Sequence, residues 1–99
     1  MPRCLMIIYA RLTDREAFGA YARAVPPLVA KFGGAYRVLG GNPEVLEGEW
    51  PFQTAAVSEW PSREAALSFW RSPEYIAAKE LRAGTGDFQV VLLDGKDGD

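Results

Sequence analysis

Glu59 is the residue of this sequence that is best placed for acid or base chemistry. It stands near the end of segment 54–60, whose composition is typical of a β-strand. Successive strand side chains point to opposite faces, so Glu59 and Trp60 lie on opposite sides of a sheet. If Trp60 packs beneath helices, Glu59 points into an apolar space that favours proton transfer. The alternative is a structural ion pair or a residue at the rim.

Three other residues are candidates for binding a substrate. Arg37, in segment 35–39, would lie diagonally across a hairpin from Glu59 and can hold an anionic group; its alternative is an ordinary solvated residue. Tyr9 has a phenol that can donate a hydrogen bond. Trp50 lies in a loop longer than a tight hairpin needs. It can serve as a lid or as an anchor on a partner subunit, or it can simply fill the end of a core.

The sequence lacks the residues on which most metal and nucleophilic chemistry depends. It contains no histidine, which removes Ser-His-Asp and Cys-His catalysis and histidine-bound zinc or haem. Its single cysteine, Cys4, has no base beside it in the sequence. The glycine pairs 33–34 and 40–41 lack the strand-to-helix context of a dinucleotide loop, and the carboxylates show no metal-binding spacing. We therefore expect no cofactor and no metal.

Length and composition indicate one small globular domain. The 99 residues fit a single unit, which we expect to span 1–95, with a flexible tail at 96–99. The net charge is −2 and the arginines are scattered singly, which argues against a nucleic-acid partner. No segment approaches the roughly 18 apolar residues that span a bilayer, and the apolar run 4–10 is too short for a signal peptide. A single cysteine makes a reducing cytoplasm the default location.

Hydrophobic periodicity and turn residues predict the element order βαββαβ. The predicted strands cover 4–12, 35–39, 54–60 and 88–93, and Val45 and Leu46 are candidates to extend the central hairpin. The first helix starts at Thr13 or Asp14 and ends at Gly33-Gly34. The second starts at Ser62 and restarts at Ser72-Pro73. Such a chain forms an α+β, ferredoxin-like sandwich with both helical segments on one face of a four-stranded antiparallel sheet.

The first and last strands are apolar on both sides, although helices can cover only one. Segment 4–12 places Met6, Ile8 and Ala10 on one side and Leu5, Ile7 and Tyr9 on the other. An apolar face of roughly several hundred Å² is rare on a soluble monomer. We therefore expect a homodimer that packs sheet against sheet about a two-fold axis. The alternative is a monomer with a ligand cleft on that face.

Four segments together resemble one known family. They are 18–34 (FGAYARAVPPLVAKFGG), 45–51 (VLEGEWP), 59–66 (EWPSREAA) and 72–75 (SPEY). In this order they are similar to the domain-of-unknown-function family 1330 of the dimeric α+β barrel superfamily. The resemblance covers nearly the whole chain, although Trp60 stands where that family usually has phenylalanine. It implies a ferredoxin-like protomer and a barrel made by two facing sheets, and it implies no established activity.

Two functions follow as hypotheses. Relatives in the wider superfamily include cofactor-independent monooxygenases, haem-degrading enzymes, muconolactone isomerase and stress-response barrels, and a fold alone does not choose among them. The first hypothesis is a cofactor-independent isomerase or monooxygenase that acts on a small hydrophobic or aromatic anionic metabolite, with Glu59 assisted by Arg37 or Tyr9. The alternative is a non-catalytic dimeric module that binds a ligand or stabilises a complex.

Overall fold

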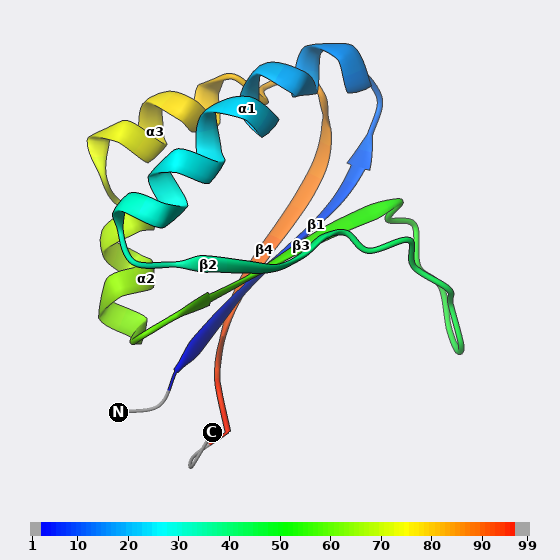
Figure 1. The fold of residues 1–99 in the computed structure, drawn as a ribbon. Helices are drawn as coiled ribbons and strands as arrows, with labels where there is room; N and C mark the ends of the chain where they lie inside the picture. The colour runs from blue at the N-terminus through cyan, green and yellow to red at the C-terminus, as the bar shows by residue number, and fades with distance from the viewer. Residues whose placement is uncertain (1–2, 97–99) are drawn as a thin grey trace.

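A four-stranded antiparallel sheet carries three helices on one of its faces (Figure 1). The computed structural model describes residues 3–96. The elements are β1 (Cys4–Leu12), α1 (Arg15–Lys31), β2 (Ala35–Gly40), β3 (Thr54–Trp60), α2 (Arg63–Trp70), α3 (Pro73–Glu80) and β4 (Gly86–Asp94). This is the predicted βαββαβ order with the second helix divided in two, and the fold is ferredoxin-like. Of the predicted tail 96–99, residues 97–99 lie outside the described part of the chain.

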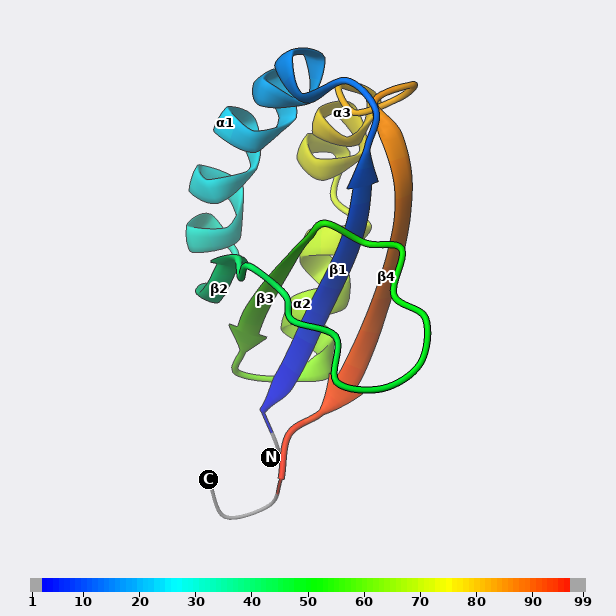
Figure 2. The same cartoon turned by 90° about the vertical axis from the view of Figure 1, so that its right-hand side faces the viewer.

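The sheet has the strand order β2-β3-β1-β4. In the central strand β1, Leu5 lies opposite Glu59 of β3 and opposite Leu93 of β4. A bulge interrupts the β2–β3 pairing between Tyr36 and Val38. Tyr36 pairs with Ser58 and points toward the helices, while Arg37, the extra residue of the bulge, lies on the opposite face, where its side chain reaches Glu59. The turned view in Figure 2 shows the long β1 and β4 strands side by side, with α2 behind the sheet and α1 to its left.

Short polar side chains begin the helices, as the sequence predicts. Asp14 accepts a hydrogen bond from the Ala17 amide of α1 at 3.0 Å. Ser62 and Ser72 do the same at the starts of α2 and α3, each at 3.1 Å. These caps satisfy amides that have no partner in the first turn of a helix. The Ser72 cap separates α2 from α3 and fixes the turn between them.

Helix α1 continues unbroken through Pro26 and Pro27. Proline has no amide hydrogen, so the carbonyls one turn earlier, on Ala22 and Arg23, lose their usual helical donors. Both of these residues are exposed, so water can hydrogen-bond the two carbonyls. The missing bonds are therefore tolerated where the helix is accessible to water, while Val25 stays buried.

The core lies between the helices and the inner face of the sheet. Trp60 is 1% exposed, its ring centroid lies 4.9 Å from that of Phe69, and its indole N–H donates to Ser58 Oγ at 2.9 Å. Gly34 lets this indole approach, because a Cβ there would lie 2.8 Å from three Trp60 ring atoms. Cys4 is completely buried in the same cluster, and burial raises the pKa of its thiol.

The connection between β2 and β3 differs from the sequence prediction. Residues 41–53 contain no strand, so the expected extension of the hairpin through Val45 and Leu46 is wrong. Gly40, Gly41 and Asn42 adopt positive φ angles in succession, which ends the strand pairing. The loop instead projects away from the body of the protein (Figure 1). Among residues 3–96, none of the helices has the length and apolar character that crossing a bilayer requires.

Candidate functional site

The sheet face opposite the helices is apolar in its centre and only partly covered. Ile7 of β1 lies between Val57 of β3 and Val91 of β4 in the strand register. Val91 is 42% exposed and Leu93 is 47% exposed in the single protomer. We call this surface the open face. It has the two-sided apolar character that the sequence predicted for the first and last strands.

Glu59 lies on the open face and is held by two arginines. Its Oε1 accepts a hydrogen bond from Arg37 Nε at 3.1 Å, and its Oε2 lies 3.0 Å from Arg3 Nη1. The Glu59 side chain is 20% exposed, whereas both arginine side chains are more than half exposed. Trp60 points to the opposite side beneath the helices, as the strand alternation predicted. The Arg37–Glu59 contact expected from the hairpin is present.

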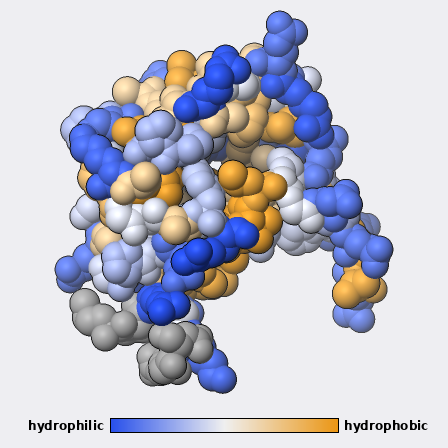
Figure 3. Space-filling view, viewed as in Figure 1, coloured by the Kyte–Doolittle hydropathy of each residue, from blue (hydrophilic) through white to orange (hydrophobic). Residues whose placement is uncertain are grey.

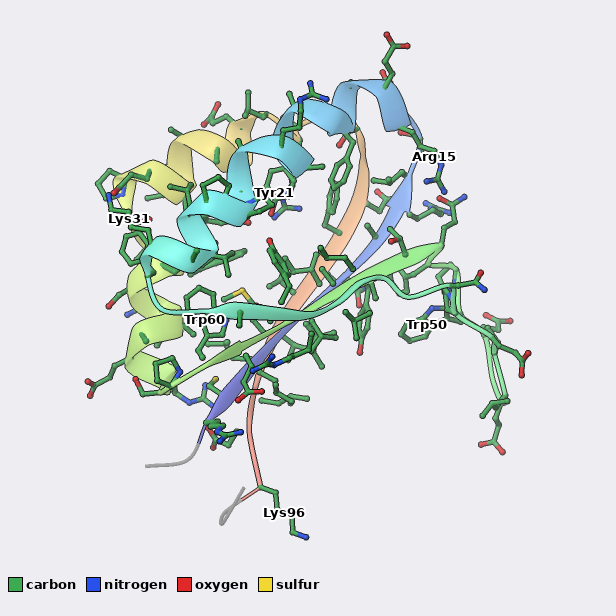
Figure 4. All side chains as sticks on the ribbon, in the orientation of Figure 1. Arg15, Tyr21, Lys31, Trp50, Trp60 and Lys96 are labelled. Carbon is green, nitrogen blue, oxygen red and sulfur yellow. The ribbon has the colours of Figure 1, made fainter. Side chains whose placement is uncertain are left out.

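Tyr9 and Trp50 meet at the other end of the open face. Their ring centroids are 4.6 Å apart in an edge-to-face arrangement, and Phe52 completes the cluster at 5.5 Å from Tyr9 and 5.2 Å from Trp50. Trp50 remains 38% exposed, so this aromatic cluster is still in contact with solvent on one side. Figure 4 shows Trp50 beside the sheet where the 41–53 loop returns to it.

The four candidate residues therefore form two separate pairs. Glu59 lies opposite Leu5 in β1, whereas Tyr9 is four positions further along that strand. Four strand residues span about 13 Å. Glu59 with Arg37, and Tyr9 with Trp50, thus share a face without touching one another. A ligand that contacts both pairs of one protomer would have to bridge the distance between them.

A cavity of about 320 Å³ lies on the other face of the sheet, between α1 and the strands. Its walls are almost entirely apolar and come from α1, β1, β2, β3 and β4. The lining includes Ile8, Phe18, Val25, Leu39, Ala56 and Phe88. The space-filling view shows apolar surface gathered between α1 and β2 (Figure 3). We call this space the α1 cavity.

Three residues with side-chain hydroxyls line the α1 cavity, namely Tyr21, Tyr36 and Thr54. Tyr21 and Tyr36 both line it, and the Tyr21 hydroxyl lies 2.8 Å from the Tyr75 hydroxyl. Figure 4 shows Tyr21 on α1, above the sheet. Burial raises the pKa of Tyr36 to about 12, and burial together with Tyr75 raises that of Tyr21 even further. Both phenols are therefore protonated at neutral pH, and each hydroxyl carries a hydrogen that it can donate.

Sequence reasoning missed the α1 cavity. The signal that points to it is a set of small residues at facing positions: Ala10 in β1, Ala22 in α1, Gly40 in β2, and Ala55 and Ala56 in β3. Small side chains on several elements leave volume that the neighbouring aromatic residues do not fill. Such residues look like ordinary core positions until the strand register and the placement of α1 bring them together.

The described residues offer no group of metal ligands. Within residues 3–96, no three His, Cys, Asp or Glu side chains are close enough together to hold a metal ion. Arg11 and Asp87, which also lie on the open face, pair with each other across β1 and β4. The chemically distinctive features are therefore the arginine-held Glu59, the aromatic cluster around Tyr9, and the α1 cavity.

Solved structures with the same fold come from several bacteria. A protein of unknown function from Rhodopseudomonas palustris is 23% identical, covers 97% of this chain and 84% of its own, and superposes with a TM-score of 0.81. A dimeric ferredoxin-like protein of unknown function from Jannaschia sp. CCS1 is 13% identical, with coverages of 92% and 97% and a TM-score of 0.72. These likenesses establish the fold, and the second protein is described as a dimer.

A third similar structure carries a provisional description as an enzyme. This protein, from Nitrosomonas europaea, is described as an antibiotic biosynthesis monooxygenase. It is 13% identical, covers 97% of this chain and 92% of its own, and superposes with a TM-score of 0.60. A search of curated proteins gave no significant match. The sequence profile of the domain of unknown function DUF1330 matches residues 3–96. The chain therefore belongs to the DUF1330 family.

Proposed function

We propose that this protein is a homodimer that binds a small hydrophobic or aromatic metabolite in the α1 cavity. The observation that carries the proposal is the cavity itself, which is already formed in the structure and has a volume of about 320 Å³. Pockets for small ligands are mostly apolar, begin at about 300 Å³, and contain a few well-placed polar groups. The α1 cavity is apolar and reaches this volume, and Tyr21, Tyr36 and Thr54 are the hydroxyl-bearing residues of its lining.

Filling the α1 cavity tests this proposal. Ala56 is a partly buried β3 residue that lines the cavity, so Ala56→Leu places a branched side chain in the empty space. We expect the variant to fold with unchanged or slightly raised stability, because it adds apolar contacts without displacing neighbours. We also expect it to abolish thermal stabilisation by aromatic ligands, which reaches about 2.7 kcal/mol at 100 times the dissociation constant.

The matched control for that experiment is Val57→Leu. Val57 is the next residue in β3 but lies on the open face, so its enlargement leaves the α1 cavity unchanged. A screen of aromatic and aliphatic ligands by differential scanning fluorimetry measures both variants against the parent protein. Equal ligand-induced shifts in Ala56→Leu and the parent would show that the ligand lies elsewhere.

The homodimer follows from the open face. Ile7, Val57 and Val91 form the centre of an apolar surface that an isolated protomer leaves in contact with water. A second copy related by a two-fold axis covers this surface with an identical one. Similar folds described as dimeric support self-association. In such a dimer the α1 cavities lie on the outer sides of the facing sheets, one in each protomer.

A second candidate function places chemistry between the facing sheets. Glu59, Arg37, Tyr9 and Trp50 share the open face, and in the proposed dimer they line its interior. There Arg37 would hold an anionic substrate while Glu59 transfers a proton, as a cofactor-independent isomerase or monooxygenase requires. The provisional description of the Nitrosomonas protein fits this class of reaction. The observation in favour is the shared face, whereas the pairing of Glu59 with two arginines favours a structural role.

Glu59→Gln separates catalysis from ion pairing. If Glu59 transfers a proton, the variant loses at least about 100-fold in turnover of a bound ligand while the dimer persists. If it only pairs with Arg37 and Arg3, turnover is unchanged and the free energy of unfolding falls by about 1 kcal/mol. The experiment measures turnover, sedimentation and urea unfolding on the same preparation. Glu64→Gln, at an exposed position in α2, is the control for a generic loss of charge.

A further inference from the structure

Arg82 is a buried cation without a counter-ion. It follows α3 and is 7% exposed. The ion pairs among residues 3–96 do not include it, and its Nε is buried with no hydrogen-bond partner. The arginine side chains that do form ion pairs are at least 48% exposed. Burying an unpaired charge opposes folding, so the position of Arg82 requires an explanation.

Aromatic rings account for only part of the environment of Arg82. Its guanidinium carbon lies 4.2 Å from the ring centroid of Phe88 and 5.4 Å from that of Tyr21. Such contacts stabilise a cation placed over a ring, but they satisfy no N–H donor. Of the nitrogens of the guanidinium, Nε is the one that is both buried and without a hydrogen-bond partner among the described residues. The group is thus prepared for an acceptor that the chain itself does not supply.

The backbone holds Arg82 in a fixed position. The Arg82 carbonyl accepts hydrogen bonds from the Thr85 amide at 3.1 Å and from Thr85 Oγ1 at 2.6 Å. The Thr85 carbonyl in turn accepts from the amides of Thr13 and Asp14 at the start of α1. Gly86 allows this close packing, since a Cβ there would clash with the Arg11 carbonyl oxygen. The turn after α3 is therefore a rigid support for the arginine.

Arg82 lines a second cavity, of about 480 Å³, between the end of α3 and the start of β4. The charged residues around it are Lys79, Glu80 and Arg82, so the lining carries one net positive charge. Lys79 is already placed over the Trp70 ring at 4.6 Å, which leaves Arg82 as the cation nearest to Phe88. Phe88 lines this cavity and the α1 cavity alike, so the two share one wall.

We infer that Arg82 binds the carboxylate of a small aromatic or aliphatic acid whose apolar part packs against Phe88. This inference rests on the proposed function, since it treats the two cavities as adjoining parts of one ligand site. A carboxylate accepts two parallel hydrogen bonds from a guanidinium, and its single negative charge matches the single net positive charge of the lining. Arg82, rather than Arg37 on the open face, is then the residue that selects anionic ligands.

Benzoate and benzamide are the probes that test this assignment. They share a ring and differ in charge, so a guanidinium site distinguishes them while an apolar cavity does not. Calorimetric titration of Arg82→Met should show benzoate affinity reduced at least about tenfold, with benzamide affinity within about twofold of the parent. Arg82→Lys keeps the charge but loses the planar fork, so it should bind benzoate with intermediate affinity. Arg71→Met, at an exposed position after α2, controls for the loss of one arginine.

The outcomes separate this inference from the proposed function. Benzoate binding that survives Arg82→Met, or that is lost in Arg37→Met instead, overturns the Arg82 site and leaves the α1 cavity standing. Failure of the parent protein to bind either probe at millimolar concentration overturns both. Folding is measured independently, since replacing a buried unpaired charge by methionine should leave the thermal midpoint equal to or above that of the parent. A large fall in the midpoint would show that Arg82 has a structural partner and would contradict the inference.

Discussion

Replacing Val91 with glutamate is expected to convert the proposed dimer into monomers without unfolding them. Val91 lies on the open face opposite Ile7 and is 42% exposed in the protomer, so its side chain has room in the monomer. In a dimer packed through this face, the two-fold axis places two new carboxylates in an apolar interface. An unpaired buried charge costs several kcal/mol, so the dissociation constant should rise at least about 100-fold.

Leu81→Glu is the matched control, because Leu81 is 45% exposed but lies after α3 on the helical side. Sedimentation velocity at micromolar concentration compares the two variants, and circular dichroism checks that both are folded. A Val91→Glu protein that sediments as the same dimer as the parent would show that the open face is not the interface. Monomeric behaviour of the parent at this concentration would contradict the homodimer as well.

Replacing Trp60 with alanine should remove much of the stability of the protomer. Trp60 is 1% exposed, packs on Phe69 and bonds to Ser58, and it fills the space that Gly34 leaves open. Truncation of a buried tryptophan to alanine costs about 3–5 kcal/mol. The total stability of small domains is about 5–15 kcal/mol, so we expect this variant to lose a large share of its stability and to unfold at a clearly lower urea concentration.

Trp50→Ala provides a direct comparison at a tryptophan that is 38% exposed. It loses the contacts with Tyr9 and Phe52 but creates no closed cavity, so its cost should be about 1 kcal/mol. Urea unfolding followed by far-ultraviolet circular dichroism measures both variants without relying on tryptophan fluorescence. Equal destabilisation by the two changes would contradict the placement of Trp60 at the centre of the core.

The fold could be predicted from local features of the sequence. The apolar segment of β1, the Ser62 and Ser72 caps, and the glycines after α1 each act over a few residues, and each predicted its element. The resemblance to the DUF1330 family added the same topology. The 41–53 loop was harder, because the apolar pair Val45 and Leu46 favours a strand while the positive φ angles of the preceding residues end the pairing.

The candidate site was predicted less completely, since it depends on how distant elements meet. Strand alternation correctly placed Glu59 away from Trp60, and hairpin geometry correctly brought Arg37 to Glu59. The roles assigned to Glu59, Arg37, Tyr9 and Trp50 stay predictions. The α1 cavity depends on the volume left between five elements, which no local pattern encodes.

The burial of Arg82 could not be predicted from the sequence either. In the sequence it is one of several scattered arginines near the end of a helix, where cations are common and solvated. Its burial results from the turn held by Thr85 and from the rings of Tyr21 and Phe88, which come from α1 and β4. A buried cation without an ion-pair partner can be recognised only once the residues packed around it are known.

Because Cys4 is completely buried, the reactivity of its thiol reports on transient opening of the folded protomer. It is the single thiol of the sequence, and a maleimide reagent cannot reach its sulfur until β1 separates from the helices. When closing is faster than modification, the rate of labelling gives the free energy of that opening under fully native conditions. Labelling of the unmodified protein with and without a ligand can thus show whether a ligand in the α1 cavity slows the opening of β1.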